Sequence, residues 1–592
     1  MARTVGIGIQ SFEKLITEHC FYIDKTDFIR EWWENKDDVT LIARPRRFGK
    51  TLNMNMLERF FSIEYAGWGS VFEGLSIWRE ERYRGLQGTY PVIMLSFASV
   101  KETTYENTRK KLCHIITELY NRYDFLLDSE CLNEKEKEYY RKVSVDMEDY
   151  TATEALKAMS GFLMRYYGKK VIILLDEYDT PMQEAYVCGY WEELAAFTRS
   201  LFNAAFKTNP YMERAIMTGT TRISRESMFS DLNNLEVVTA TSEKYKDRFG
   251  FTQEEVSGAL EEFSLAGREE EVKQWYDGFV FGSRDGIYNP WSVLNYLDKK
   301  KAGAYWANTS SNSLAGTLIR EGSPELKMVM EKLLQGETLH TALDEQIVFS
   351  QLDQGDEAVW SLLLASGYLK AVHAELNMER LEMEYDLKLT NLEVRFMFLQ
   401  MIRGWFGGCR QTQKAFLKAL LSDDLEGMNE YMNEVSCELF SSFDTGKKPS
   451  GKAQPERFYH GFVLGLMVDL QDRYVITSNR ESGFGRYDIM LEPKRGGLDG
   501  YIIEFKVIHT ERGETLEDGV KSALKQIEEK QYETALRSRG TGPERIKKYG
   551  FAFEGRRVLI GKNGGEQDGA LQRKAKGYER EAPKGDPNLR FP

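Results

Sequence analysis

Residues 39–53, VTLIARPRRFGKTLN, have the types and the order needed to bind a phosphate group. A short apolar run is followed by a turn that ends in Gly49-Lys50-Thr51, and a segment with helical spacing comes next. In this layout backbone N–H groups and a helix N-terminus face the phosphates. Lys50 would add a point charge, and the Thr51 hydroxyl could hold Mg²⁺.

This loop departs from the pattern G-x-x-x-x-G-K-[ST] at its first position, where Arg44 replaces glycine. Glycine relieves steric strain in a tight turn, so we expect the loop to take a somewhat different path. The three arginines at 44, 46 and 47 would add positive charge where phosphate would sit. The alternative is a structural turn with exposed arginines. The candidate nucleotide-binding residues of the loop are Arg46, Arg47, Phe48, Gly49, Lys50 and Thr51.

Two carboxylates follow a second apolar run and could serve ATP hydrolysis. The run VIILLDE is rich in β-branched residues, which is typical of a buried parallel strand, and it ends in Asp176-Glu177. Asp176 could hold Mg²⁺ together with Thr51, and Glu177 could orient the attacking water. The alternative is a core strand that happens to end in two acids.

Two further apolar runs, PVIMLSF at 91–97 and RAIMTGTTR at 214–222, alternate with helical segments. This alternation predicts a parallel sheet with covering helices and with ligands at the carboxyl ends of its strands. Thr218 could sense the γ-phosphate and Arg222 could neutralise it, or Arg222 could be a solvated loop charge. We therefore predict an ATPase core up to about residue 255, with ATP and Mg²⁺ as cofactors.

Composition limits the class of protein. The chain has 592 residues, enough for several domains, and 42% of them are hydrophobic. Its apolar runs fall short of the roughly 18 residues of a membrane span, and a signal-peptide core is lacking, so we expect neither membrane insertion nor secretion. The six cysteines form no C-x-x-C pair and the six histidines give no zinc signature, which indicates reduced thiols and a cytoplasmic protein. A net charge of −13 argues mildly against general adhesion to nucleic acid but is compatible with a local basic groove.

Three segments around the core have two interpretations each. The amphipathic stretch at 21–34 could pack on the sheet edge or form a wall near the nucleotide base. The aromatic stretch at 275–297, WYDGFVFGSRDGIYNPWSVLNYL, is typical of a packed interdomain core, with base stacking as the alternative. A helix and two strands at 359–390 suggest a winged-helix-like module, which could bind DNA or serve as a lid.

A hairpin near the C-terminus predicts a second site. If the strands RYDIML and YIIEFKV fold about Gly496, Asp488 falls opposite Glu504. Directly opposed carboxylates, with Cβ atoms about 5 Å apart, are destabilising, and a divalent cation would remove that cost. Lys506 projects from the same face, so the trio could hold Mg²⁺ and position or deprotonate water. The alternative is a solvated face with a salt bridge. Gln526 on a later helix and Glu456 on the helix that opens this domain could join the site or be surface residues.

Together RPRRFGKT, ILLDEYD, WYDGFVFG with YNPWSVLNYL, ERFYHGFVLGL and DIML…IIEFKV resemble the bacterial AAA-ATPase-like proteins with a C-terminal PD-(D/E)XK nuclease-superfamily domain. The resemblance covers about residues 4–562. It implies an α/β multidomain protein with a P-loop, AAA/ASCE-like parallel-sheet ATPase core, a helical or winged-helix-like middle and a PD-(D/E)XK-like α/β domain. By this resemblance Asp176 and Glu177 are the Walker B acids. The implied nuclease triad is Asp488, Glu504 and Lys506, with Gln526 as its helical companion.

The domains expected are an ATPase domain at 1–255, a helical lid or winged-helix-like region at 256–443, a linker at 444–455, a nuclease-like domain at 456–562 and a disordered tail at 563–592. The expected function is ATP hydrolysis coupled to a nuclease that uses Mg²⁺ or Mn²⁺ on DNA, with RNA as an alternative substrate, in DNA maintenance or defence. The first rival is a regulatory NTPase switch whose nuclease-like domain only binds nucleic acid or protein. The second rival is a nuclease whose degenerate P-loop is structural. A homo-oligomer is compatible with each of these. The candidate metal ligands are Thr51, Asp176, Asp488, Glu504 and Glu456.

Overall fold

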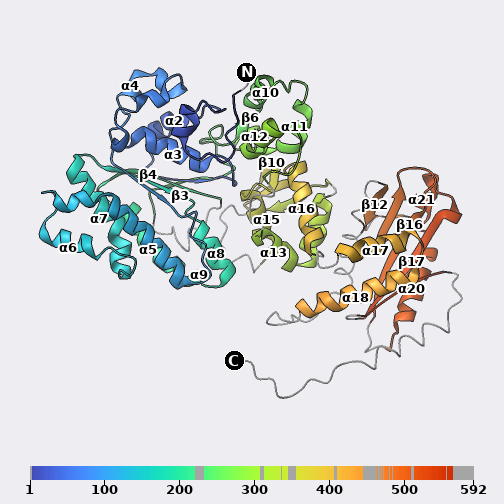
Figure 1. The fold of residues 1–592 in the computed structure, drawn as a ribbon. Coiled ribbons are helices and arrows are strands. Elements are labelled where there is room, and N and C mark those ends of the chain that lie inside the picture. The colour runs from blue at the N-terminus through green and yellow to red at the C-terminus, as the bar shows by residue number, and fades with distance from the viewer. Residues whose placement is uncertain are drawn as a thin grey trace, which may run out of the picture. The chain divides into compact units, whose positions relative to one another are not determined.

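The computed structural model describes residues 3–220, 232–306, 313–334, 336–343, 355–405, 410–443, 463, 467, 470, 473–478, 481–482, 485–508, 513–554 and 557–563. Its internal contacts divide the chain into two compact units, Met1–Gln400 and Met401–Pro592. Each unit is described by itself below, with the element labels of Figure 1.

The first unit is built on a five-stranded parallel sheet. In spatial order its strands are β2 (Val92–Ser96), β3 (Val171–Asp176), β4 (Met212–Gly219), β1 (Val39–Ala43) and β5 (Leu235–Val238). Strands β1 to β4 are the four apolar runs of the sequence, and their prediction as one parallel sheet is confirmed. β5 was not predicted, because it has only four residues and three of them are partly exposed.

Helices cover both faces of this sheet (Figure 1). One face carries α2 (Asp27–Asn35) and α3 (Lys50–Phe61), and the other carries α5 (Tyr105–Arg122), α7 (Asp149–Tyr167) and α9 (Trp191–Phe202). Shorter helices are α1 (Phe12–Thr17), α4 (Glu81–Arg84), α6 (Glu134–Lys142) and α8 (Thr180–Cys188). The strands read as continuous apolar runs because both faces are buried.

A small antiparallel sheet follows the core, made of β6 (Phe251–Thr252), β8 (Arg284–Tyr288) and β7 (Phe279–Phe281). Around it lie α10 (Gln253–Glu262), α11 (Glu269–Tyr276) and α12 (Pro290–Lys299). The aromatic segment supplies much of the interior here, since Tyr276, Tyr288 and Tyr296 are fully buried in one cluster. Their burial favours the packed-core interpretation of that segment over base stacking.

The rest of the first unit contains the predicted helix and hairpin. The elements are α13 (Ser313–Glu321), α14 (Pro324–Leu334), β9 (Leu339–Ala342), α15 (Asp356–Ala365), β10 (Leu369–Asn377), β11 (Glu382–Leu389) and α16 (Leu392–Trp405). The three strands form an antiparallel sheet in the order β10-β11-β9. The hairpin tip exposes apolar Met378 and Leu381 beside acidic Glu379 and Glu382. The exposed Arg380 lies between them, so the tip carries charges of both signs.

The second unit has a mixed five-stranded sheet. Its strands, in order, are β12 (Tyr474–Ser478), β15 (Ile489–Pro493), β16 (Gly500–Val507), β17 (Ile546–Glu554) and β18 (Arg557–Lys562). Only the β16–β17 pair is parallel. Two-residue strands β13 (Glu481–Ser482) and β14 (Gly485–Arg486) pair with each other. Helix α20 (Leu516–Glu529) packs against β16, β17 and β18, and the short α21 (Thr534–Ser538) follows it.

Helices α17 (Arg410–Leu421) and α18 (Leu425–Phe443) also belong to the second unit. Residues 410–443 were predicted to belong to the middle region, but their apolar faces pack on the C-terminal sheet. Phe416 and Met428 share one buried cluster with Ile503 and Phe505 of β16. The sequence predicted a mostly helical region here but did not identify the sheet that these helices cover.

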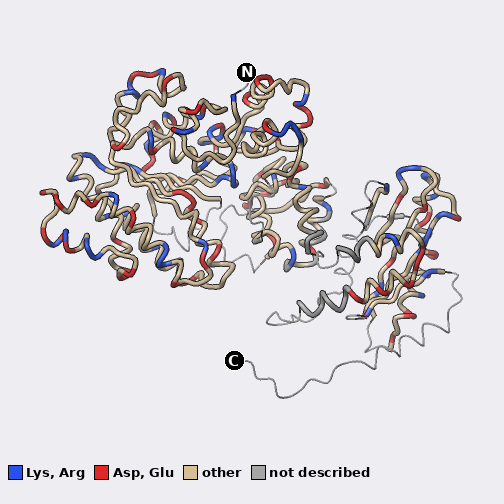
Figure 2. Tube along the Cα trace, viewed as in Figure 1, with Lys and Arg blue, Asp and Glu red and all other residues tan. Residues whose placement is uncertain are grey.

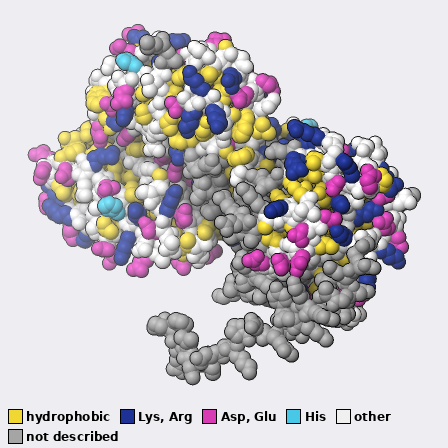
Figure 3. Space-filling view, turned by 45° about the vertical axis from the view of Figure 1, so that its right-hand side comes forward, with side chains coloured by type: hydrophobic (Ala, Val, Ile, Leu, Met, Phe, Trp, Pro, Cys, Tyr) yellow, Lys and Arg dark blue, Asp and Glu magenta, His cyan; other side chains and the backbone are white. Residues whose placement is uncertain are grey.

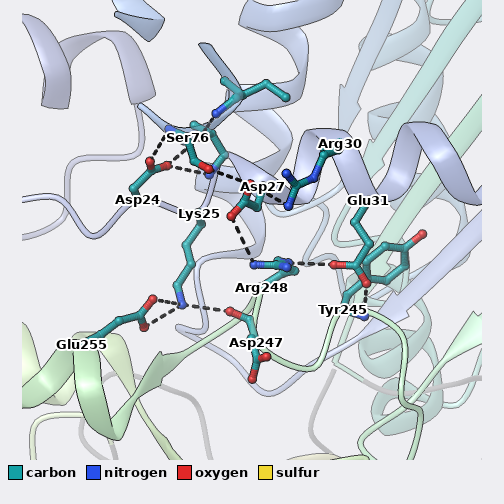
Figure 4. A network of polar contacts seen from close by, with 12 residues as sticks. Asp24, Lys25, Asp27, Arg30, Glu31, Ser76, Tyr245, Asp247, Arg248 and Glu255 are labelled. Atoms are coloured by element: carbon teal, nitrogen blue, oxygen red, sulfur yellow. Dashed lines mark hydrogen bonds and ion pairs between the residues drawn. The ribbon is translucent and has the colours of Figure 1, made fainter. Parts of the chain in front are cut away.

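A polar network fixes the N-terminal segment against the loop that follows β5 (Figure 4). The ammonium of Lys25 donates to both carboxylate oxygens of Glu255 at 2.7 Å and to the carbonyl of Asp247 at 2.9 Å. Arg248 pairs with Glu31 at 2.7 Å, and its carbonyl accepts a bond from Asn53 of α3 at 3.1 Å. The network thereby holds this loop beside the helix that follows the phosphate-binding loop. These contacts support the interpretation of the segment at 21–34 as a packing element of the first unit.

Charges of both signs are interspersed along the described parts of each unit (Figure 2). In the space-filling view, basic and acidic side chains alternate with apolar ones over the visible described surface (Figure 3). Within the described residues, no helix combines the length and the apolar character needed to span a bilayer.

Candidate active sites

The phosphate-binding loop joins β1 to α3. Gly49 precedes α3 with φ 81°, in the left-handed region that favours glycine. The buried Lys50 ammonium donates to the loop carbonyls of Arg44 at 2.7 Å and Pro45 at 2.9 Å. Burial lowers the pKa of Lys50 to about 8. The side chain therefore lies across the loop at the N-terminus of α3, where a bound phosphate would meet it.

Arg44 does not face the phosphate position, which corrects the expectation from its sequence position. Its guanidinium is buried, donates to the carbonyl of Thr239 at 2.5 Å and lies over the ring of Phe281 at 4.3 Å. Burial lowers the pKa of Arg44 to about 9. Arg44 thus anchors the start of the loop to residues that follow the core.

The next two arginines also point to protein partners. Arg46 donates to the side-chain oxygen of Gln183 in α8 at 2.9 Å, and the guanidinium of Arg47 lies 4.5 Å from the ring centre of Trp291. Arg47 has φ 68°, a strained value for a residue with a side chain. The two guanidinium groups that were expected at the phosphate position are therefore held by protein partners, Arg46 by a polar side chain and Arg47 by an aromatic ring.

Phe48 is the hydrophobic anchor of the loop. Its ring is buried and packs edge-on against Phe279 at 4.7 Å and Phe281 at 5.6 Å. Gly250 and Gly367 approach the same loop closely, since a Cβ on Gly367 would lie 2.8 Å from Pro45. Phe48 was a candidate nucleotide contact; its side chain is enclosed by protein, which leaves only its backbone for a ligand.

Two strands of the sheet, β3 and β4, and the first turn of α3 bring the Mg²⁺ candidates together. The buried Asp176 carboxylate at the end of β3 accepts bonds from the hydroxyls of Thr51 at 2.7 Å and Thr218 at 2.5 Å. Burial raises the pKa of Asp176, and both hydroxyls oppose that shift. A carboxylate and two hydroxyl oxygens are hard donors of the kind that Mg²⁺ binds, so these residues fit the ion.

Glu177 follows with φ 52°, a backbone conformation that non-glycine residues seldom adopt. Its N–H lies 3.4 Å from the Thr218 hydroxyl, and its carboxylate accepts a bond from Thr180 at 3.0 Å. Such local strain concentrates at functional sites. Asp179, which the sequence analysis did not select, is buried and accepts the N–H of Thr220 at 2.9 Å. Its signal in the sequence is the third acid of DEYD.

The second site lies on the hairpin of β15 and β16. Ile489 pairs with Ile503, which confirms the predicted register and places Asp488 opposite Glu504. One Asp488 oxygen accepts the N–H of Phe505 at 2.7 Å. The apolar residues Ile503 and Phe505 point into the opposite core, as predicted.

Lys506 and Gln526 complete the group of predicted residues at this hairpin. The Lys506 ammonium donates to Gln526 Oε1 at 2.7 Å and lies 3.5 Å from Glu504 Oε1. The same Glu504 oxygen also accepts a bond from Gln526 Nε2. Two strands and α20 thus bring together four residues that are up to 38 positions apart in the sequence, because Asp488 and Gln526 mark the ends of that span.

The second carboxylate oxygen of Glu504 tests whether this site fits a cation. Within the described residues, Oε2 is buried and has no hydrogen-bond partner. Burial and then the charge of Asp488 raise the pKa of Glu504 to about 8, against the opposing charge of Lys506. A divalent cation between the two carboxylates would satisfy Oε2 and remove their repulsion, so the site fits such an ion.

The described part of the chain contains no group of three or more His, Cys, Asp or Glu that could hold a metal. Mg²⁺ commonly uses one or two carboxylates and completes its shell with water and substrate phosphate. Asp488 and Glu504 meet that smaller requirement. Two predicted site residues, Arg222 and Glu456, lie outside the described residues.

Comparison with known proteins finds a family match for the region that contains each site. Residues 6–229 match the AAA-ATPase-like family, described as "Predicted AAA-ATPase", and residues 454–563 match the PD-(D/E)XK nuclease superfamily. An "Uncharacterized protein in vnfD 5'region" of Azotobacter chroococcum mcd 1 is 25% identical over 559 residues, which cover 91% of this chain and 94% of that protein. Among solved structures, "Structure of the Aeropyrum Pernix ORC2 protein (ADPNP-ADP complexes)" is 10% identical with a TM-score of 0.22, covering 63% of this chain and 91% of that one. The chain therefore combines an AAA-ATPase-like domain with a C-terminal domain of the PD-(D/E)XK nuclease superfamily.

Proposed function

We propose that the chain hydrolyses ATP in its first unit and cleaves nucleic acid at a divalent-metal site in its second unit. The observation that carries the nuclease assignment is the buried Oε2 of Glu504, which lacks a hydrogen-bond partner within the described residues, on a strand whose register sets Glu504 opposite Asp488. Membership of the PD-(D/E)XK superfamily supports the same reaction class. DNA is the proposed substrate, with RNA as the alternative, and a role in DNA maintenance or defence would fit the pairing of activities by analogy.

At the first site Lys50 would exchange the carbonyls of Arg44 and Pro45 for the phosphates of ATP. Thr51 and Asp176 would hold Mg²⁺, which supplies charge neutralisation during phosphoryl transfer. Glu177 would orient the attacking water from the end of β3. The contacts of Thr218 with both Asp176 and the Glu177 backbone suit a residue that responds to the γ-phosphate.

At the second site Asp488 and Glu504 would hold one Mg²⁺ or Mn²⁺. The ion would lower the pKa of a bound water and stabilise charge on the phosphodiester. Lys506 is held beside Glu504 by Gln526, where its ammonium can position that water or stabilise the developing charge. Glu504 would be ionised with metal bound, because the cation replaces the proton that burial otherwise favours.

One observation favours a second candidate, a regulatory NTPase switch whose C-terminal domain binds nucleic acid or protein without cleaving it. Within the described residues, no third His, Cys, Asp or Glu joins Asp488 and Glu504 in a group that could hold a metal ion. A binding-only domain would tolerate the loss of either acid, whereas a nuclease would not.

The two candidates differ in a cleavage assay with the full chain. Labelled single-stranded DNA, double-stranded DNA and RNA are incubated with Mg²⁺ or Mn²⁺, with and without ATP. We expect the wild type to cleave DNA, Asp488→Ala to abolish cleavage, and Asp499→Asn, an acid in the turn of the same hairpin, to retain it. Lys50→Ala tests whether any effect of ATP on cleavage depends on the first site. Intact ATP turnover without cleavage of any substrate would favour the regulatory switch.

A further inference from the structure

Tyr532 lies in the second site although it is six residues beyond Gln526, a spacing that does not place two residues on one helix face. Helix α20 ends at Glu529, and Gln531 then adopts φ 52°. The N–H of Tyr532 donates back to the carbonyl of Ile527 at 3.3 Å. This left-handed ending turns the chain onto the helix, as at many helix C-termini.

The reversed chain buries the Tyr532 ring and places its hydroxyl beside Gln526. The ring is 1% exposed and packs edge-on against Tyr487, with ring centres 6.1 Å apart. The hydroxyl oxygen accepts a bond from Gln526 Nε2 at 3.1 Å. The hydroxyl of Tyr487 has a different partner and shares a hydrogen bond with the hydroxyl of Thr477 at 2.7 Å.

The nitrogen and the oxygen of the Gln526 side-chain amide bond to different partners. Its two N–H hydrogens have two acceptors, Glu504 Oε1 and the Tyr532 hydroxyl, while its oxygen accepts from Lys506 at 2.7 Å. A flipped amide would set oxygen against the Glu504 carboxylate and NH₂ against the Lys506 ammonium. The observed orientation is therefore the one that electrostatics favours.

We propose that Tyr532 is a positioning residue for the nuclease reaction, acting through the amide of Gln526. By accepting the second N–H hydrogen, its hydroxyl fixes the amide plane. The fixed amide holds Lys506 in place and occupies Glu504 Oε1, which reserves Oε2 for the cation. This inference rests on the proposed function, because it assigns Lys506 to the reacting water.

The variant Tyr532→Phe removes the hydroxyl and keeps the buried ring, so we expect it to fold. Loss of a group that orients a ligand commonly costs about 10–100-fold in activity, and we expect kcat for cleavage to fall by that factor. KM and the Kd for Mn²⁺ should stay within about 3-fold of wild type, since Asp488 and Glu504 Oε2 are unchanged. Tyr487→Phe, which removes a neighbouring hydroxyl that bonds Thr477, is the matched control and should retain full kcat.

A double-mutant cycle separates positioning from general loss of stability. If Tyr532 acts through Gln526, adding Tyr532→Phe to Gln526→Ala should lower kcat no further. Additive losses, or a Tyr532→Phe variant with wild-type kcat, would overturn the proposal.

A second readout needs no nuclease activity. Lys506 is acetylated with an N-hydroxysuccinimide ester, and its modification rate is compared with that of Lys525 by mass spectrometry. We expect Lys506 to react several-fold faster in Tyr532→Phe and in Gln526→Ala, with Lys525 unchanged. If the wild type cleaves nothing yet Lys506 responds in this way, the proposed function fails and the positioning role stands. An unchanged Lys506 rate in both variants would overturn the positioning role.

Discussion

Metal binding at the second site should release a proton from Glu504. Burial and the charge of Asp488 raise the pKa of Glu504 to about 8, so the metal-free site is mainly protonated at pH 7. The cation needs the ionised carboxylate and must displace that proton. From the raised pKa, release should be more than half a proton per metal at pH 7 and should fall as the pH rises through about 8.

Titration calorimetry measures this number. Mn²⁺ is added to the metal-free chain in two buffers of different ionisation enthalpy, and the difference in heat gives the protons released. The Asp176→Asn background is used because burial also raises the pKa of Asp176. Below the Glu504 pKa, the apparent Mn²⁺ affinity should rise by nearly tenfold per pH unit.

Glu504→Gln isolates the source of the proton. This variant keeps the shape of the side chain but has no proton to exchange, and we expect weaker Mn²⁺ binding with little release at either pH. Release near zero in the parent at pH 7, or equal release in Glu504→Gln, would refute the assignment of Glu504 as a buried metal ligand.

Three further outcomes are expected. First, the metal-free second unit should lose stability as the pH rises from about 4.5 through about 8. The folded-state pKa of Glu504 is raised, so the folded chain binds this proton more tightly than the unfolded chain does. The resulting stabilisation is complete only at low pH. The loss of stability is at most about 5 kcal/mol. Hydrogen exchange of residues 487–508, corrected for intrinsic rates, measures this loss. An equally steep decline in Glu504→Gln would contradict the assignment of the effect to Glu504. Second, Phe48→Ala should destabilise the first unit by about 3–5 kcal/mol in urea unfolding followed by tryptophan fluorescence, because the ring is enclosed by Phe279 and Phe281. Phe125→Ala, at a ring 36% exposed, should cost clearly less, and equal losses would count against Phe48 as the anchor of the loop. Third, Glu177→Gln should bind ATP normally in a filter assay yet release phosphate at least about 100-fold more slowly; normal turnover would assign the water to another residue.

The sequence predicted the parts of the fold that depend on local patterns. Four buried strands were readable from continuous apolar runs, and the pairing of Asp488 with Glu504 followed from the hairpin turn alone. The role of Arg44 was not readable, because its partners Thr239 and Phe281 are brought to it only by the tertiary fold.

Missed site residues have a similar cause. Tyr532 depends on the left-handed conformation of Gln531, which no spacing rule reveals. Helices α17 and α18 fall in a region that was predicted to be mostly helical, but their apolar faces fit any hydrophobic surface, and the pattern could not select the C-terminal sheet. Periodicity specifies which face is buried and leaves its partner undetermined.

The most direct test of the nuclease assignment is a metal titration of cleavage. Chelator-treated wild type is mixed with end-labelled double-stranded DNA, and the initial cleavage rate is followed as Mn²⁺ is added, beside Asp488→Ala and Asp499→Asn. The proposed site predicts no cleavage without metal, a rate that saturates at the Mn²⁺ affinity found by calorimetry, full activity in Asp499→Asn and none in Asp488→Ala. Cleavage that persists in Asp488→Ala, or that needs no metal, would contradict the assignment of Asp488 and Glu504 as the nuclease metal site.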